Sequence, residues 1–144
     1  MANREDELTI ACVRYFKLKY PNEMIYHVAN QRKTGKARGA KLKKMGVLAG
    51  VSDLHVPVAK GRYIGLVIEL KHEKNVAGKM VRGDYPTPEQ REFLSKMHTY
   101  GYAVYVCWNL DEFMALLDRY MRGDKIECEY LVKNGHLNKN GILT

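Results

Sequence analysis

Three charged residues stand where the sequence predicts buried strands. Asp53 precedes one apolar alternation, and Glu69 and Lys71 end another, which begins at Leu66. Side chains two positions apart in a strand point to the same face, so Glu69 and Lys71 share a face while Leu70 points into the core. Burying an acid and a lysine is costly unless they are paired. The spacing alone leaves two interpretations, an edge-strand charge pair or a site that hydrolyses phosphodiesters.

Mg²⁺ or Mn²⁺ is the cofactor that these residues would suit, because Asp53 and Glu69 offer hard oxygen ligands. If strands 54–58 and 63–71 form a hairpin, the two carboxylates meet at one sheet edge, and the backbone carbonyl of Leu70 adds a ligand. The ion would polarise the scissile phosphate and lower the pKa of a bound water. Lys71 would neutralise the developing charge or orient that water. No organic cofactor is expected.

Two histidines flank the trio and are not expected to bind zinc. His72 directly follows Lys71 in a predicted strand, so it should face away from that lysine, and His55, close to Asp53, is likewise not expected to form a zinc site. Glu73 is in phase with Glu69 and Lys71, which would let it reach substrate or a second metal, but a solvated charge at the end of the strand is the simpler interpretation.

A basic segment precedes Asp53. Residues 24–52 contain no acid. A solvated helix face usually mixes both signs of charge, whereas this block is of one sign and suits contact with phosphates. Such contacts carry no base sequence, so recognition would be by backbone or shape. The predicted DNA-binding residues are Arg32, Lys33, Lys36, Arg38, Lys41, Lys43 and Lys44.

The overall composition favours one basic domain. The chain has 144 residues and a net charge of +8, which favours a polyanionic partner, nucleic acid before an acidic membrane surface. No apolar stretch is long enough to span a membrane, and the acidic N-terminus is not typical of a signal peptide. Three well-separated cysteines indicate reduced thiols and a cytosolic protein. We expect a single domain over 1–144, with its core at 4–122.

The periodicities predict an α/β (α+β) fold in the order α-β-α-β-β-α-β-α, with a mixed sheet flanked by helices. Helices are expected over 3–20, within 30–46, from 87 and over 110–121, and strands over 24–29, 54–58, 63–71 and 102–108. Thr87, Pro88 and Gln90 predict a capping box with proline at the first helical position. Residues 76–85 are expected to be a loop, and the tail 123–144 a short hairpin or partly disordered.

Four segments at these spacings resemble the VRR-NUC nucleases of the PD-(D/E)xK superfamily. They are residues 46–54, 65–71, 87–90 and 101–102, and the similarity runs from about Glu5 to about Tyr120. The resemblance implies a restriction-endonuclease-like core. Asp53 and Glu69 would bind the metal and Lys71 would be the catalytic lysine.

Further roles come with this resemblance. Glu5, with Glu7 as its rival, matches a glutamate that the family's first helix places near the metal, and Gln90 matches a glutamine on the helix after the core motif. Ser52 replaces the proline of the "PD" pair, a conformational change rather than a lost ligand. Thr9 stands where relatives often carry glutamine, and Asn30 where they often carry asparagine.

The short, stand-alone chain is similar to bacteriophage and prophage members, which resemble Holliday junction resolvases. The resemblance therefore implies a metal-dependent DNA endonuclease, selective for branched DNA, that acts as a homodimer in the cytoplasm of a bacterial host. One alternative is a nuclease of the same fold that cuts flaps or nicked duplex. Another is a basic DNA-binding module without catalysis.

Overall fold

A four-stranded mixed sheet forms the centre of the protein, which we describe from a computed structural model over residues 4–29 and 35–133. The strand order is β1-β2-β3-β6. β3 pairs antiparallel with β2 and parallel with β6, and β1 pairs antiparallel with β2. The strands are β1 (Tyr26–His27), β2 (Leu54–Val56), β3 (Leu66–Leu70) and β6 (Ala103–Cys107). The predicted hairpin between the second and third strands is therefore confirmed.

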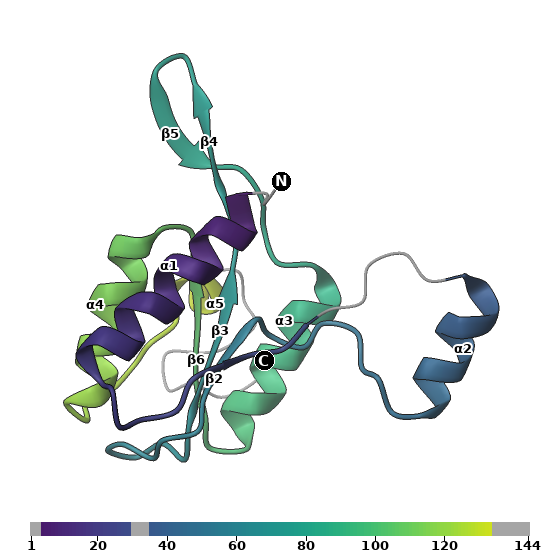
Figure 1. Ribbon diagram of the computed structural model, residues 1–144, viewed down its shortest axis with the longest axis horizontal. Helices are drawn as coiled ribbons and strands as arrows, with labels where there is room; N and C mark the ends of the chain where they lie inside the picture. Colours follow the sequence, from purple (N-terminus) through teal and green to yellow (C-terminus); the bar gives the residue numbers. More distant parts are fainter. Residues whose placement is uncertain (1–3, 30–34, 134–144) are drawn as a thin grey trace.

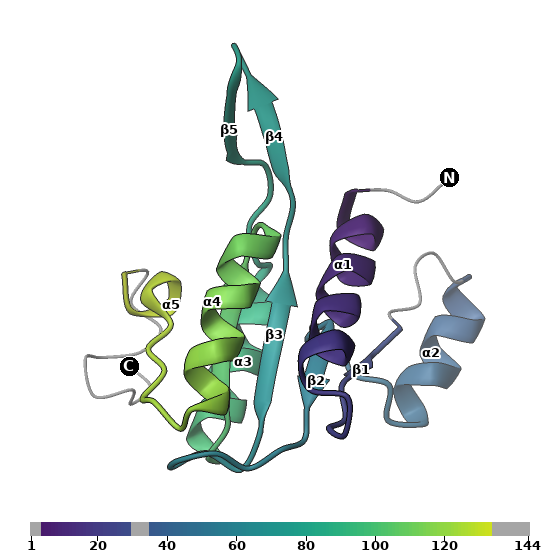
Figure 2. The same ribbon diagram turned by 60° about the vertical axis from the view of Figure 1, so that its left-hand side comes forward.

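Helices cover both faces of this sheet (Figures 1 and 2). They are α1 (Arg4–Lys19), α3 (Pro88–Thr99) and α4 (Leu110–Met121). Leu66, Ile68 and Leu70 of β3 belong to one core cluster with residues of α1 and α4, whereas Val67 belongs to a second cluster with Leu94 of α3. All five residues of β3 are buried, as its nearly continuous apolar run predicts.

The start of α3 confirms the predicted capping box. The Thr87 hydroxyl accepts a hydrogen bond from the Gln90 backbone N–H at 3.2 Å, and the Gln90 side-chain oxygen accepts one from the Thr87 N–H at 2.8 Å. Pro88 occupies the first turn, where it sacrifices no helical hydrogen bond. Gly101, with a φ of 106°, follows the end of the helix in the left-handed region that favours glycine. These contacts fix where the helix begins and ends.

The structure adds a second, separate sheet to the predicted order. β4 (Glu73–Val76) and β5 (Lys79–Arg82) form an antiparallel hairpin that projects beyond the body (Figures 1 and 2). The prediction of a loop over 76–85 is therefore wrong for β5. Both strands are almost fully exposed, so no core selects an apolar alternation that the sequence could display.

The tail also differs from its prediction. Residues 129–133 form the short helix α5 (Glu129–Lys133), not a hairpin, and its Leu131 is buried beside Trp108. The remainder of the tail, from residue 134, lies outside the described residues. Among the residues that the structure describes, no helix is both long and apolar enough to cross a membrane.

The basic helix α2 (Lys36–Lys44) stands to one side of the body (Figure 1). It buries none of its residues, and its first turn carries no acid. Packing therefore contributes little to the stability of this helix. The basic helix predicted within 30–46 is present.

Candidate active site

The carboxyl end of β3 brings Asp53, Glu69 and Lys71 together. The Asp53 carboxylate accepts a hydrogen bond from the Leu70 backbone N–H at 2.8 Å, which holds it beside the strand that carries Glu69. Lys71 Nζ lies 3.7 Å from Glu69 Oε1. Glu69 and Lys71 are only 1% and 5% exposed. The arrangement expected from strand phase and from the β2–β3 hairpin is thus the one observed.

Glu69 is the electrostatic centre of this group. Desolvation, followed by repulsion from Asp53, raises its pKa from 4.5 to about 9, and the charge of Lys71 offsets only part of this shift. Its Oε2 atom is buried and has no hydrogen-bond partner among the described residues. A buried acid with an unfilled oxygen beside a second carboxylate would be stabilised by a cation.

A pocket of about 590 Å³ opens onto these three residues. Glu5, from the first turn of α1, lines the same pocket, whereas Glu7 is exposed and does not. Gln90 also lines this pocket, and its side-chain oxygen accepts the hydrogen bond of the capping box. The structure therefore places all five predicted catalytic residues around one cavity. The hydroxyl of Thr9 donates to the Glu5 carbonyl at 2.8 Å, a contact within the helix.

The loop that carries Asp53 packs against the start of α3 through Gly50. Gly50 has a φ of 87°, and a Cβ there would lie 2.5 Å from the backbone carbon and oxygen of Glu89. Only glycine permits both the conformation and the close approach. The nearby Ser52 is buried, with no partner for its hydroxyl among the described residues. This packing fixes Asp53 and Gln90 relative to each other.

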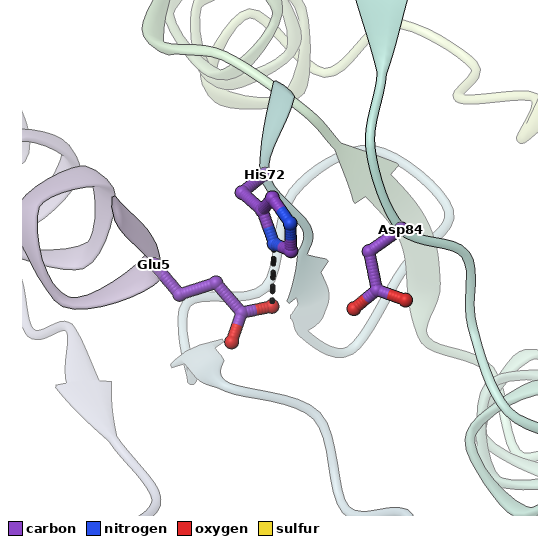
Figure 3. Close-up of side chains that lie close together, drawn as sticks. All are labelled: Glu5, His72 and Asp84. Atoms are coloured by element: carbon purple, nitrogen blue, oxygen red, sulfur yellow. Dashed lines mark ion pairs between the residues drawn. The ribbon is translucent and has the colours of Figure 1, made fainter. Parts of the chain in front are cut away.

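Sequence reasoning missed Asp84 and set His72 aside. Asp84 Oδ2 lies 3.5 Å from Lys71 Nζ, so the lysine stands between Glu69 and Asp84. On the other side His72 Nδ1 lies 3.8 Å from Glu5 Oε1 (Figure 3). Ligand atoms of Glu5, His72 and Asp84 all lie within 4.8 Å of one another. No motif marks Asp84, because the return of the β4–β5 hairpin places it there.

The predicted DNA-binding residues are only partly described. Arg32 and Lys33 lie outside the described residues, as does Asn30. Of the rest, Lys43 lines the pocket that holds the carboxylates. The other four are exposed on α2, and they are Lys36, Arg38, Lys41 and Lys44. The basic helix therefore borders the candidate site.

Comparison with known proteins supports the resemblance seen in the motifs. A solved structure described as a VRR_NUC domain protein is similar to this chain, with a TM-score of 0.66 and 25% sequence identity. The similarity covers 88% of this chain and 95% of the other. No protein-family model and no curated protein matches the sequence.

Proposed function

Starting from the VRR-NUC fold of this chain, we propose that it is a metal-dependent DNA endonuclease with a PD-(D/E)xK core. The observation that carries this proposal is the buried acid Glu69, whose Oε2 has no hydrogen-bond partner in the described part of the chain and which lies beside Asp53 and Lys71 in an open pocket. A protein that only binds DNA gains nothing from an acid whose burial is so costly. An enzyme that hydrolyses phosphodiesters can use such an acid in its chemistry.

The donor set fits Mg²⁺ or Mn²⁺. Carboxylate oxygens of Asp53, Glu69 and Glu5, with the carbonyl of Leu70, are hard ligands of the kind that both ions prefer. A bound ion would supply positive charge to the scissile phosphate and lower the pKa of a coordinated water. His72 and Asp84 border these ligands, and His72 would help to keep Glu5 in place.

Lys71 is proposed to act on the reacting phosphate. Its ion pairs with Glu69 and Asp84 are long, at 3.7 and 3.5 Å. They hold the ammonium group in place and leave it able to interact with a phosphate. From there it would neutralise the charge that develops on the phosphate or orient the attacking water. The buried position makes this electrostatic effect stronger than it would be in bulk water.

DNA is the proposed substrate. The net charge of +8 and the exposed basic residues of α2 support phosphate contacts beside the pocket. The motif resemblance extends this proposal to branched DNA and to a homodimer, in which two sites related by a two-fold axis would cut two strands symmetrically. The same resemblance suggests the cytoplasm of a bacterial host, and free, buried Cys12, Cys107 and Cys128 suit a reducing compartment.

Cleavage of a panel of labelled DNAs tests the proposal. Four-way junctions, flaps, nicked duplexes and linear duplexes are incubated with Mg²⁺ or Mn²⁺, and the cuts are mapped to the nucleotide. We expect paired, symmetrical nicks in junctions, and a particle mass of two chains by light scattering. Cutting of flaps alone would assign the same chemistry to another substrate. If every substrate stays intact with both metals, the nuclease proposal is wrong.

Matched variants separate chemistry from binding. Asp53→Asn and Lys71→Ala should slow cutting by about 10²–10³-fold or more while DNA binding persists. Lys125→Ala, at an exposed lysine beyond α4, should cut like the wild type. Equal cutting by all four proteins would point to a contaminating nuclease.

A further inference from the structure

The β4–β5 hairpin grows directly out of the candidate site. β4 begins at Glu73, two residues after Lys71, and β5 ends at Arg82, two residues before Asp84. The two strands pair with each other and not with the central sheet. Both views show the hairpin projecting beyond the body (Figures 1 and 2). DNA seated at Lys71 would therefore run close to its base.

The turn at the tip is well defined. Ala77 and Gly78 have φ values of 53° and 84°, which suits the two-residue turn that best matches the twist of paired strands. The side-chain oxygen of Asn75 accepts a hydrogen bond from the Gly78 N–H at 3.0 Å. The segment is thus built as a ribbon and is not simply a long loop.

One face of the base is fastened to the body. Glu73 and Arg82 are cross-strand partners, so their side chains share a face. The Arg82 guanidinium lies 3.8 Å from the centre of the Trp108 ring and 3.8 Å from Glu112, and Asn109 donates to Glu73 at 3.4 Å. These contacts hold the base of the hairpin against the start of α4.

The opposite face carries exposed lysines. Lys74 pairs across the strands with Val81, and Lys79 with Val76, so these four side chains form one surface, here termed the lysine face. All four are exposed. Among the described residues, no carboxylate pairs with either lysine. A surface with these two lysines suits a polyanionic partner better than it suits an apolar one.

We propose that the lysine face binds the phosphate backbone of the DNA arm beside the cut, an inference that rests on the proposed nuclease function. A two-stranded ribbon is narrow enough to follow a DNA groove, and lysines on it reach the flanking phosphates. Because α2 also borders the pocket, the DNA would contact two separate basic surfaces, α2 and the lysine face. Contacts of this kind position the substrate without reading base sequence.

Salt dependence of binding tests this inference. The affinity of wild-type protein and of K74A/K79A for a labelled four-way junction is measured by fluorescence anisotropy over a range of NaCl concentrations, without divalent metal so that the DNA stays intact. Each lost phosphate contact should reduce the slope of log affinity against log salt by about 1. K74R/K79R, which keeps the charge, should retain the wild-type slope. K17A/K125A, which removes two exposed lysines elsewhere, should retain it too.

The outcomes are separable from those of the nuclease proposal. An unchanged slope in K74A/K79A, or an equal loss in K74R/K79R, would overturn the assignment of the lysine face even if the wild type cuts DNA. If V76S/V81S changes the particle mass while the slope of K74A/K79A is unchanged, the face belongs to a second copy of the chain and the inference fails. Wild-type protein that binds no DNA would overturn both proposals.

Discussion

Two lysine–carboxylate pairs near opposite ends of α1 are built in different ways. Beside its last turn, Lys19 Nζ lies 2.6 Å from Asp118, and the hydroxyls of Tyr15 and Tyr20 donate to the same carboxylate. Beside its first turn, the buried Glu69–Lys71 pair is separated by 3.7 Å, and Glu69 Oε2 lacks a hydrogen-bond partner among the described residues. The first pair has its hydrogen bonds filled and the second does not.

This contrast is the one expected between a structural pair and a pair with a role in chemistry. Desolvation alone would raise the pKa of Asp118, but hydrogen bonds from Lys19 and Tyr15 outweigh it, so the pKa is lowered and the carboxylate is stabilised. Desolvation of Glu69 is not balanced in this way, and its pKa is raised to about 9. A group that destabilises the fold in its charged form is a candidate for a role in chemistry.

The largest expected difference between the two pairs is in catalysis. Lys71→Ala should reduce the single-turnover cleavage rate by about 10²–10³-fold or more, because a charge aimed at the transition state is lost. Lys19→Ala removes the lysine of the structural pair and should cut at the wild-type rate. Quenched-flow assays on one labelled junction measure both. Equal losses of cleavage rate in the two variants would show that the two pairs do not differ in their role in catalysis.

Metal binding should be the next largest effect. Mn²⁺ or Mg²⁺ at about 100 times its Kd should stabilise the wild type by about 2.7 kcal/mol, since the ion binds the folded state alone. Asp118→Asn should respond equally, whereas Asp53→Asn and Glu69→Gln should respond weakly. Thermal denaturation with and without metal provides the measurement. A full response in Asp53→Asn would place the ion elsewhere.

The unbalanced burial of Glu69 gives metal-free stability an unusual pH dependence. Between pH 4.5 and about 9 the folded protein keeps a proton on Glu69 that the unfolded chain has lost, so stability falls as pH rises. Glu69→Gln should remove this slope and stabilise the metal-free protein by about 2 kcal/mol at pH 6, and by more at higher pH. Urea titrations at several pH values test this. A Glu69→Gln protein that is less stable than the wild type and keeps the same dependence of stability on pH would contradict this prediction.

The contribution of the Lys19–Asp118 pair to stability should have the opposite pH dependence, and its effect should be the smallest. Because the pKa of Asp118 is lowered, its contribution is present above its ordinary value of 3.8 and is lost as pH falls through the folded value. Asp118→Asn should lower Tm by about 2 °C at pH 7, as expected for a partly exposed pair. The difference from wild type should vanish in strong acid. Calorimetry of both proteins at pH 7 and in strong acid provides the measurement.

Sequence reasoning predicted the site wherever chain neighbours determine the geometry. Strand phase placed Glu69 and Lys71 on one face, and the antiparallel hairpin brought Asp53 to them. The capping box of α3 could be predicted because it involves residues three apart. The same locality explains the correct positions of most helices and of the central strands.

The failures lie where contacts are distant or where no core is present. Asp84 reaches Lys71 only because the intervening hairpin folds back, and a single sequence carries no signal of that return. The hairpin itself buries almost nothing, so its residues display no apolar period. His72 was expected to face away from Lys71, and its contact with Glu5 across to α1 could not be foreseen.

Gly50 has a consequence for how this protein can vary. It bears no functional group, yet its backbone lies against Glu89 at a distance that excludes any side chain. In a random-mutagenesis library, inactive variants should therefore accumulate at this position as densely as at Asp53. Screens that rank residues by lost activity would then count Gly50 among the catalytic residues, although its contribution is the absence of a side chain.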